Sequence, residues 1–247
     1  MAVIWHRDTA GSRYEVRTHG ASVRLYSNGV FHSQWNPKDP LKGSLWELLL
    51  LPVYFLPRAQ VRRVLVLGVG GGAVIRLLQQ FFDPEQIVGV DIDPTHLEVA
   101  RRFFGVQGAE LVCADARAFV REQQSTTGPA FDVIVDDLFG HVDGEAERAV
   151  TADEPWCKGL LTLLSDSGVV IGNFGSRREL LDSGWQSPSL RERVSAGWTA
   201  ELPEFENCIG IFGGAELARA ALTSQAPAAL NPDNPHRKLH ARLRPLR

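Results

Sequence analysis

The middle of the chain is a succession of short apolar runs separated by stretches of mixed polarity. The first run, residues 64–67, leads directly into the glycine-rich segment 68–72, and similar runs follow at residues 86–90, 109–113, 131–135 and 168–174. Continuous apolar runs of this length are typical of strands that are buried on both faces of a parallel sheet. Strands that alternate with helices in this way predict an α/β fold with a doubly wound, Rossmann-like sheet.

The N-terminal quarter of the chain follows another pattern. Residues 1–36 alternate apolar and polar positions around a Ser-Asn-Gly turn at residues 27–29, which predicts β-hairpins. Residues 43–56 predict an apolar helix that is broken at Pro52 and is too short to span a bilayer. Its leucines and aromatic residues are therefore expected in the core or at a subunit interface.

These patterns divide the chain into three parts. We expect an N-terminal β-hairpin subdomain with its connecting helix at residues 1–56, a Rossmann-like catalytic domain at residues 57–224 and a basic tail at residues 225–247. Residues 207–214 predict the last strand of the sheet. Residues 236–247 contain five Lys or Arg and no acid, which is typical of a solvated tail or of a contact with an acidic partner subunit.

The composition is that of an ordinary globular protein. Hydrophobic residues make up 44% of the 247 residues and charged residues 22%, which is enough for one substantial core. A net charge of -3 predicts no general attraction to nucleic acid or to an anionic membrane. The three cysteines form no C-x-x-C motif, so we expect neither a disulfide framework nor a metal site, and a reducing cytoplasm is the simplest location.

The glycine-rich segment predicts a site for a nucleotide-like ligand. Gly68, Gly70 and Gly72 allow main-chain N–H groups and the positive end of the next helix to approach a polar ligand closely. An acid then follows each of the next three predicted strands: Asp91, Asp115 and Asp137. Counted from Gly68, each of these acids comes 22 to 24 residues after the previous residue of the series. Since the carboxyl ends of parallel strands share one edge of the sheet, we expect these side chains at one crevice.

The residues alone leave alternatives open. Gly68, Gly70 and Ala73 also fit the dinucleotide fingerprint G-x-G-x-x-G/A. The repeated acids favour an adenosyl ligand, since one carboxylate can accept both ribose hydroxyls and the next can accept the adenine amino group. The other interpretation is that each aspartate only caps the helix that follows it.

At these positions the chain resembles the spermidine synthase branch of the class I adenosylmethionine-dependent transferases. The family's GGGDGG turn is matched by residues 68–73, its ribose-binding acid by Asp91, its GDA-like segment by residues 114–116 and the first acid of its D-S-S-D-P loop by Asp137. The resemblance implies a class I methyltransferase-type sheet with a small N-terminal β-hairpin subdomain. It also implies that an adenosylmethionine-type cofactor contacts Gly68, Gly70, Gly71, Gly72, Asp91, Ile92, Asp115, Ala116 and, from the hairpin, Gln34.

Two departures from the family pattern bear on the reaction. Gly71 stands where the family has an acid that attracts the ammonium of a decarboxylated donor, and Gly140 replaces the second acid of the loop. Because Gly71 leaves space and unpaired N–H groups for a methionine carboxylate, we expect methylation of a small molecule with S-adenosylmethionine. Asp136, Asp143 or Glu145 can supply the missing charge, so aminopropyl transfer from decarboxylated S-adenosylmethionine, as in polyamine synthesis, remains an alternative. A catalytically silent, adenosyl-nucleoside-binding scaffold is another.

The expected catalytic residues follow the fourth core strand. Asp137 would position or deprotonate the nucleophile, with Asp136 as a second acid and His141 as a candidate general base. The polar, glycine-containing segment 140–148 is where a lid over the acceptor would lie. We expect a small-molecule acceptor and a homodimer, and no nucleic-acid or membrane partner.

Overall fold

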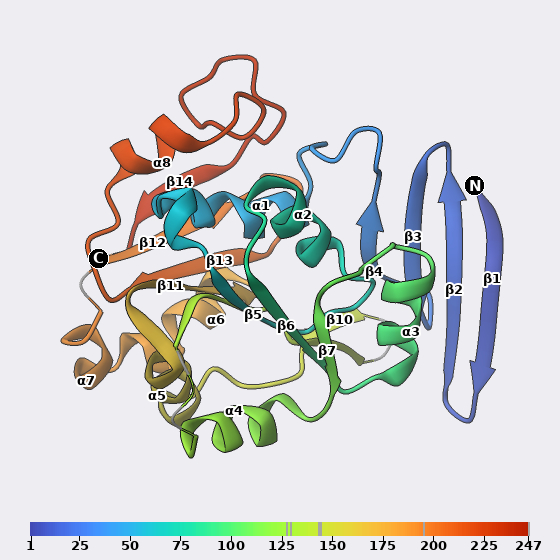
Figure 1. Cartoon of the computed structure of the whole chain (residues 1–247), viewed down its shortest axis with the longest axis horizontal. Coiled ribbons are helices and arrows are strands. Elements are labelled where there is room, and N and C mark those ends of the chain that lie inside the picture. Colours follow the sequence, from blue (N-terminus) through green and yellow to red (C-terminus); the bar gives the residue numbers. More distant parts are fainter. Residues whose placement is uncertain (127, 129, 143–144, 195, 247) are drawn as a thin grey trace.

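A large sheet forms the centre of the molecule. The computed structural model describes residues 1–126, 128, 130–142, 145–194 and 196–246, with only the backbone at residues 141, 142 and 145. In this part of the chain, eight strands make up the sheet: β5 (Arg63–Leu67), β6 (Gln86–Asp91), β7 (Glu110–Cys113), β8 (Phe131–Asp136), β11 (Leu164–Phe174), β12 (Ala196–Glu201), β13 (Cys208–Gly213) and β14 (Arg242–Pro245). Their order is β14-β12-β13-β11-β8-β5-β6-β7 (Figure 1).

The strand order explains where a ligand can bind. From β5 the chain first builds outward through β6 and β7, and then returns to the other side of β5 with β8 and β11, all of them parallel. A crevice opens at the carboxyl ends of the strands where the order reverses, here between β5 and β8. The predicted Rossmann-like sheet is confirmed, and β13, β12 and β14 extend it with antiparallel pairs.

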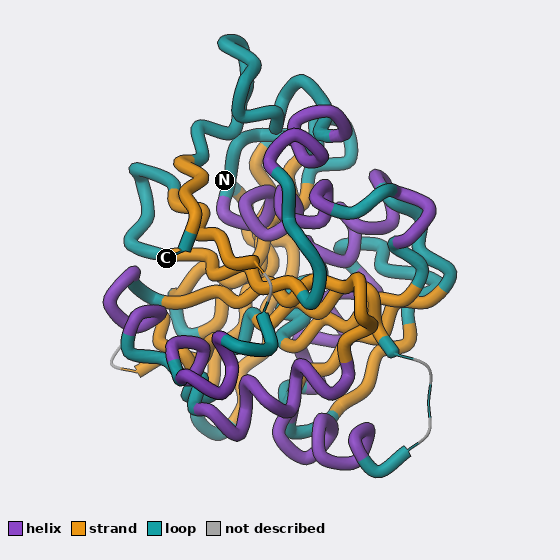
Figure 2. Tube along the Cα trace, turned by 90° about the vertical axis from the view of Figure 1, so that its left-hand side faces the viewer, coloured by secondary structure: helices purple, strands orange, loops and turns teal. Residues whose placement is uncertain are grey.

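Helices cover both faces of this sheet (Figure 2). They are α2 (Ala73–Phe81), α3 (Pro94–Arg102), α4 (Ala116–Gln124) and α5 (Glu154–Leu163). Helices α2 and α3 pack against one face of the sheet through one hydrophobic cluster, and α4 and α5 pack against the other face through a second cluster. The side chains of Asp93, Asp115 and Asp153 accept hydrogen bonds from first-turn N–H groups and begin α3, α4 and α5. Asp93 is therefore the N-cap of α3.

The N-terminal segment forms a separate antiparallel sheet at one end of the molecule (Figure 1). Its strands are β1 (Ala2–Thr9), β2 (Ser12–His19), β3 (Ser22–Ser27) and β4 (Val30–Trp35). Asn28 and Gly29 both have positive φ, 52° and 83°, the backbone that a two-residue hairpin turn requires. The Ser33 side chain of β4 accepts a hydrogen bond from the Gly71 N–H at 2.8 Å. This sheet therefore reaches the glycine-rich turn of the core.

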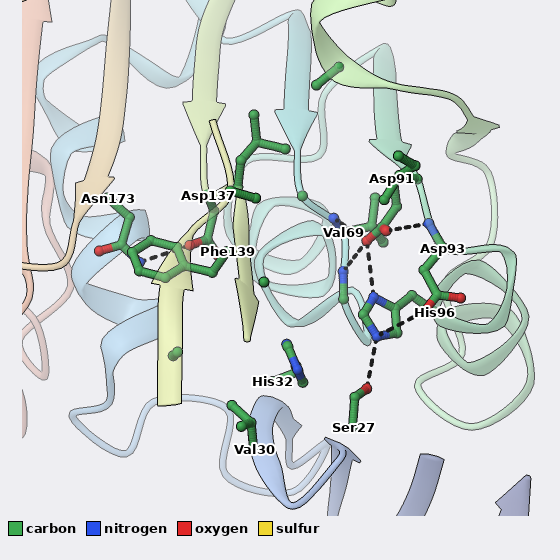
Figure 3. Close-up of a pocket in the computed structure, with 18 of the residues that line it drawn as sticks. Ser27, Val30, His32, Val69, Asp91, Asp93, His96, Asp137, Phe139 and Asn173 are labelled. Carbon is green, nitrogen blue, oxygen red and sulfur yellow. Dashed lines mark hydrogen bonds and ion pairs between the residues drawn. The ribbon is translucent and has the colours of Figure 1, made fainter. Parts of the chain in front are cut away.

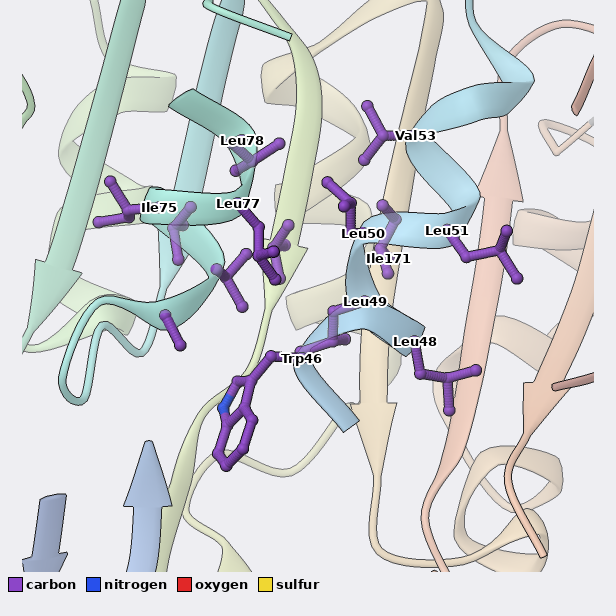
Figure 4. Close-up of a cluster of buried hydrophobic side chains, with 14 of the residues drawn as sticks. Trp46, Leu48, Leu49, Leu50, Leu51, Val53, Ile75, Leu77, Leu78 and Ile171 are labelled. Atoms are coloured by element: carbon purple, nitrogen blue, oxygen red, sulfur yellow. The ribbon is translucent and has the colours of Figure 1, made fainter. Parts of the chain in front are cut away.

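A buried apolar segment connects the two sheets. It consists of α1 (Leu45–Leu50) and a 3-10 helix, η1 (Leu51–Phe55), with Pro52 in the first turn of η1. Leu48, Leu49, Leu50 and Leu51 are completely buried and lie close to α2 and β11 (Figure 4). The expected broken helix is thus part of the core. None of the helices in the described chain combines the length and the apolar character needed to span a membrane.

The remaining elements are η2 (Arg58–Gln60), β9 (Phe139–Val142), β10 (Glu145–Arg148), α6 (Arg177–Leu181), η3 (Gly184–Gln186), α7 (Pro188–Arg191) and α8 (Arg219–Gln225).

The C-terminal segment is folded against the rest of the protein. Leu230 and Leu239 are completely buried, and β14 pairs with β12 at the edge of the sheet. The expectation of a solvated tail is wrong for these residues, because leucines between the basic residues supply apolar side chains to the core.

Candidate active site

A cavity of about 590 Å³ opens at the carboxyl ends of β5, β6, β7 and β8. The N-terminal sheet, α1, the β9–β10 hairpin and the loop at residues 205–207 complete its walls. Gly68, Gly70, Asp91, Asp115 and Asp137 all line it, so the structure brings together the glycine turn and the three strand-end acids. The volume lies within the range of roughly 300–1,000 Å³ that is usual for small-molecule sites.

The glycine turn is shaped by two close approaches. Gly68 has φ 89°, and a Cβ on it would lie 2.1 Å from the carbonyl oxygen of Asp137. Gly70 has φ 53°, and its Cβ would lie 2.9 Å from the Ser33 hydroxyl. Glycine is therefore required at both positions by backbone conformation and by space. The turn lies directly between β8 and the N-terminal sheet.

Every N–H group of the turn, from residue 68 to residue 72, already has a protein acceptor. The Gly68 N–H donates to the Val90 carbonyl at 2.9 Å, and the Gly72 N–H donates to the Val69 carbonyl at 2.7 Å. Asp91 Oδ2 accepts from Val69 and Gly70 at 3.0 and 2.9 Å. The Gly71 N–H donates to Ser33. An additional anion at this turn would have to share these donors.

Asp91 is held by the turn and by a histidine (Figure 3). Its Oδ1 accepts from the Asp93 N–H at 2.9 Å, and its Oδ2 lies 3.4 Å from His96 Nδ1. Burial raises the pKa of Asp91, but the bonds from His96 and the main chain outweigh burial and lower it. Burial lowers the pKa of His96, but the contacts with Asp91 and Asp93 outweigh burial and raise the pKa above its ordinary value. Asp91 is therefore an ionised carboxylate that faces the cavity.

The neighbours of Asp91 and Asp115 form the far end of the cavity. Ile92 and Ala116 both line the cavity; Ile92 is 69% exposed, and Ala116 is buried at the start of α4. Asp115 Oδ1 accepts from the Ala118 N–H at 2.8 Å. Capping of α4 and exposure to the cavity are compatible, since a carboxylate has two oxygens.

Asp137 lies at the opposite end, next to two asparagines. Asn173 Nδ2 donates to Asp137 Oδ1 at 2.8 Å, and Asn207 Nδ2 donates to Asn173 Oδ1 at 3.0 Å. Burial, with a contribution from the neighbouring Asp136 charge, outweighs the bond from Asn173 and raises the pKa of Asp137 to about 6. Such a carboxyl group is able to exchange a proton near neutral pH.

Asp136 points away from the cavity into the core. It accepts from the Arg148 guanidinium and, at 2.9 Å, from Trp156 Nε1. The side chains of Asp136 and Arg148 are only 1% and 3% exposed, and Arg148 also donates to the Asn173 carbonyl. Asp136 is not among the described residues that line the cavity. The prediction that Asp136 is a second catalytic acid is wrong. Successive residues of an extended chain face opposite sides of the sheet, and the Asp136 carboxylate is paired with Arg148 in the core.

The chain is similar in sequence and in fold to known proteins. A methyltransferase domain family model matches residues 64–153. A polyamine aminopropyltransferase of Vibrio vulnificus (strain CMCP6) is 28% identical over 160 residues, 64% of this chain and 51% of the relative. A probable spermidine synthase from Corynebacterium glutamicum ATCC 13032 has a TM-score of 0.76 at 16% identity, covering 99% of this chain and 91% of the other. A spermidine synthase in complex with the transition state analogue AdoDATO has a TM-score of 0.63 at 16% identity, covering 91% of this chain and 76% of the other.

The chain thus matches a methyltransferase domain family over residues 64–153 and is similar in sequence to polyamine aminopropyltransferases and in fold to spermidine synthases. It spans about half of the length of the Vibrio relative. Among its described residues, no group of three or more His, Cys, Asp or Glu side chains could hold a metal ion.

Three expected cofactor contacts, Gln34, Gly71 and Gly72, lie outside the described lining of the cavity. Gln34 Oε1 accepts from Arg24 Nε at 2.7 Å. A Cβ on Gly71 would lie 2.6 Å from the Phe104 ring, and one on Gly72 would lie 2.6 Å from Val106. The expectation that Gly71 leaves space and an unpaired N–H for a carboxylate is therefore wrong, because Phe104 and Ser33 occupy that space.

After Asp137, the described residues include two short antiparallel strands, β9 and β10. β9 pairs with β10, and Phe139 and Gly140 line the cavity. His141 is in β9, but its side chain, Asp143 and the Glu145 side chain lie outside the described part of the structure. The role of His141 stays a prediction.

Several residues of the site were not predicted from the sequence. They come from all parts of the chain: Tyr14, Ser27, Phe31, His32, Trp46, His96, Phe205 and Asn207. Of these residues, only His96 could have been predicted from the sequence, because it lies in the first turn of the helix after Asp91 and can face the end of the same strand. The others reach the cavity through folding of distant segments.

Proposed function

We propose that this protein transfers the aminopropyl group of decarboxylated S-adenosylmethionine to an amine. The observation that carries the proposal is the state of the glycine turn. All five N–H groups at residues 68–72 have protein acceptors, and the described cavity lining contains no Lys or Arg. A methionine carboxylate would find no unshared donor at this turn, and a buried, unpaired carboxylate is strongly unfavourable.

The charge of the cavity supports the same donor. Asp91, Asp93, Asp115 and Asp137 line the described walls, and their combined field favours a ligand with positive charge. The decarboxylated donor carries a sulfonium and an ammonium, whereas S-adenosylmethionine adds a carboxylate. The Vibrio relative is named a polyamine aminopropyltransferase, which agrees with this proposal.

The nucleoside would be held by the β6 and β7 ends of the cavity. Asp91 would accept the ribose hydroxyls, since its oxygens keep lone pairs beyond those used by the turn. Ile92 would cover one face of the adenine, and Asp115 would accept from the adenine amino group. These assignments retain the sequence prediction for Gly68, Gly70, Asp91, Ile92, Asp115 and Ala116.

Asp137 would act on the nucleophile. Asp137 lines the cavity and its main-chain carbonyl lies beside Gly68, which supports a carboxylate close to the end of the reactive arm of an adenosyl donor. The carboxylate would attract and orient the acceptor amine and receive or relay the proton that the amine loses. Asn173 would hold Asp137 in one orientation through the 2.8 Å bond. Catalysis would consist mainly of orientation, because the sulfonium is already activated.

A comparison of donors tests the proposal. In calorimetry, decarboxylated S-adenosylmethionine should bind at least about tenfold more tightly than S-adenosylmethionine, because only the latter brings an unpaired carboxylate. 5′-Methylthioadenosine, which has no amino-acid arm, serves as the control for the nucleoside grip. Equal or tighter binding of S-adenosylmethionine would contradict the proposal.

Methyl transfer is the second candidate function, and one observation favours it. Gly71 carries no carboxylate for the donor ammonium. Mass spectrometry of an amine acceptor distinguishes the outcomes by the gain of an aminopropyl group, of a methyl group, or of neither, as expected for a binding scaffold.

A further inference from the structure

Exposed apolar side chains converge on the candidate active site. Among the described residues, the large hydrophobic side chains that stay exposed are Met1, Val3, Ile4, Phe31, Ile92, Leu181 and Phe205. Three of these, Phe31, Ile92 and Phe205, line the same cavity. Exposed apolar surface that gathers in a cavity indicates an apolar ligand. Ile92 belongs to the nucleoside end, which leaves the two phenylalanines unexplained by the donor.

Phe205 lies at the Asp137 end of the cavity, and Phe31 lines the part that the N-terminal sheet and α1 contribute. Phe205 is two residues before Asn207, whose side chain bonds to Asn173 beside Asp137. Phe31, on β4, packs edge-on against Trp46 of α1 with 5.1 Å between ring centres. Phe139 also lines the cavity, near Asp137 and Asn173, and Asp91 and His96 lie across the cavity (Figure 3). We call Phe31, Trp46, Phe139 and Phe205 the aromatic wall.

The charges near the aromatic wall are limited. Of the carboxylates in the described lining, Asp91 and Asp115 lie at the nucleoside end. Asp93 is occupied by the Tyr14 hydroxyl at 2.7 Å and the Thr95 N–H at 2.8 Å. Asp137 is thus the described lining carboxylate that faces the acceptor end.

A cation already lies at the wall. The Arg24 guanidinium lies over the Phe31 ring, 5.5 Å from its centre. Arg24 makes no ion pair with a carboxylate among the residues that the structure describes; it donates to the Gln34 amide oxygen. A second ammonium close to the Phe31 ring would be repelled by Arg24.

We propose that the acceptor is a primary monoamine with an aromatic body, which places its amino group at Asp137 and its ring against Phe31, Phe139 and Phe205. This inference rests on the proposed aminopropyl transfer and specifies its acceptor. The neutral amine nitrogen forms a bond to the aminopropyl carbon next to sulfur, and the C–S bond breaks with its electron pair on sulfur. The products are the secondary ammonium, neutral 5′-methylthioadenosine and the proton that the acceptor ammonium released.

Direct binding of two amines to the full chain tests the acceptor class. With saturating 5′-methylthioadenosine present, 2-phenylethylamine should bind at least about tenfold more tightly than 1,4-diaminobutane, because it buries its ring and leaves no second charge unpaired. Transfer from decarboxylated donor, followed by mass spectrometry, should show the same preference. Equal or tighter binding of 1,4-diaminobutane, or binding of neither amine, would overturn the inference. The donor comparison is measured without any acceptor, so failure of the proposed function is recognised separately.

Two variants and one control variant test which residues contact the amines. Phe205→Ala should weaken 2-phenylethylamine binding about tenfold through lost aromatic contact and leave the affinity for 5′-methylthioadenosine unchanged. Leu181→Ala removes an apolar side chain with the same exposure, 44%, outside the described cavity lining, and should change neither affinity. Arg24→Gln should improve 1,4-diaminobutane binding severalfold, since it removes a cation near the second ammonium. An unchanged ratio of the two amines in both Phe205→Ala and Arg24→Gln would contradict the proposed wall.

Discussion

Asp137 combines three properties that a residue handling a proton needs. It lines the cavity, it has a fixed orientation through Asn173, and its pKa is raised to about 6. Asp136, the preceding residue, does not line the cavity, and its carboxylate is paired with Arg148 in the core. Two adjacent aspartates at the end of β8 thus have a chemical and a structural role because they face opposite sides.

The pKa of Asp137 predicts a pH dependence. Since the carboxylate is the active form, kcat/KM for the acceptor should rise as pH increases through about 6. Asp137→Asn should lower kcat by about a hundredfold or more and abolish this rise, with little change in donor affinity. A pH profile of both proteins, with the melting temperature of each, checks this. Wild-type turnover in a folded Asp137→Asn protein would remove Asp137 from the mechanism.

The same raised pKa also has a consequence for stability. A carboxyl group whose folded pKa exceeds its unfolded value favours the folded state below the unfolded pKa, about 3.9 for Asp. This contribution is lost as pH rises through about 6. Between about pH 4 and 6, wild type should therefore lose stability relative to Asp137→Asn.

At the scale of secondary structure elements, the β9–β10 hairpin is fixed to the core by its last residue. Arg148 ends β10, pairs with Asp136 at the end of β8 and donates to the Asn173 carbonyl of β11 at 2.5 Å. Its guanidinium also lies 5.1 Å from the centre of the Phe174 ring. One side chain thus connects the cavity wall to two core strands.

Removing the Arg148 side chain should lower the stability of the folded protein. Arg148→Met leaves the Asp136 carboxylate buried without its cation and should lower the free energy of unfolding by about 3–5 kcal/mol. Adding Asp136→Asn, which keeps an acceptor for Trp156, should recover part of the loss. Arg178→Met, which breaks an exposed pair with Asp182, is the control and should change stability by less than about 0.5 kcal/mol. Urea unfolding of the variants measures the differences, and a loss in Arg148→Met no larger than in the control would refute the role of the pair.

At the scale of the whole molecule, the C-terminal segment returns to the start of the chain. Lys238 pairs with Asp39 at 2.8 Å, and a Cβ on Gly43 would lie 2.3 Å from the Lys238 carbonyl oxygen. Leu239, the next residue, is completely buried. The segment before α1 and the C-terminal residues therefore pack as neighbours, which ties the N-terminal sheet and the core into one structure.

This packing predicts that the basic segment is needed for stability. Leu239→Ala should destabilise the protein by about 2–5 kcal/mol, as expected for a fully buried leucine. Leu181→Ala, at an exposed site, should have little effect on the urea midpoint. A Leu239→Ala protein as stable as wild type would mean that the tail is not part of the core.

Local patterns were sufficient for the parallel core and for the nucleoside end of the site. Apolar runs, a glycine turn and strand-end acids encode strands β5, β6 and β8 and bring Gly68, Asp91, Asp115 and Asp137 to one edge, because connectivity alone aligns the ends of parallel strands. Tertiary structure decided what occupies the space around them. Phe104 and Ser33 fill the room at Gly71, Arg148 takes Asp136 away from the cavity, and Phe31 and Phe205 come from distant segments to line it. Such contacts depend on the packing of residues far apart in the chain, which no local spacing specifies.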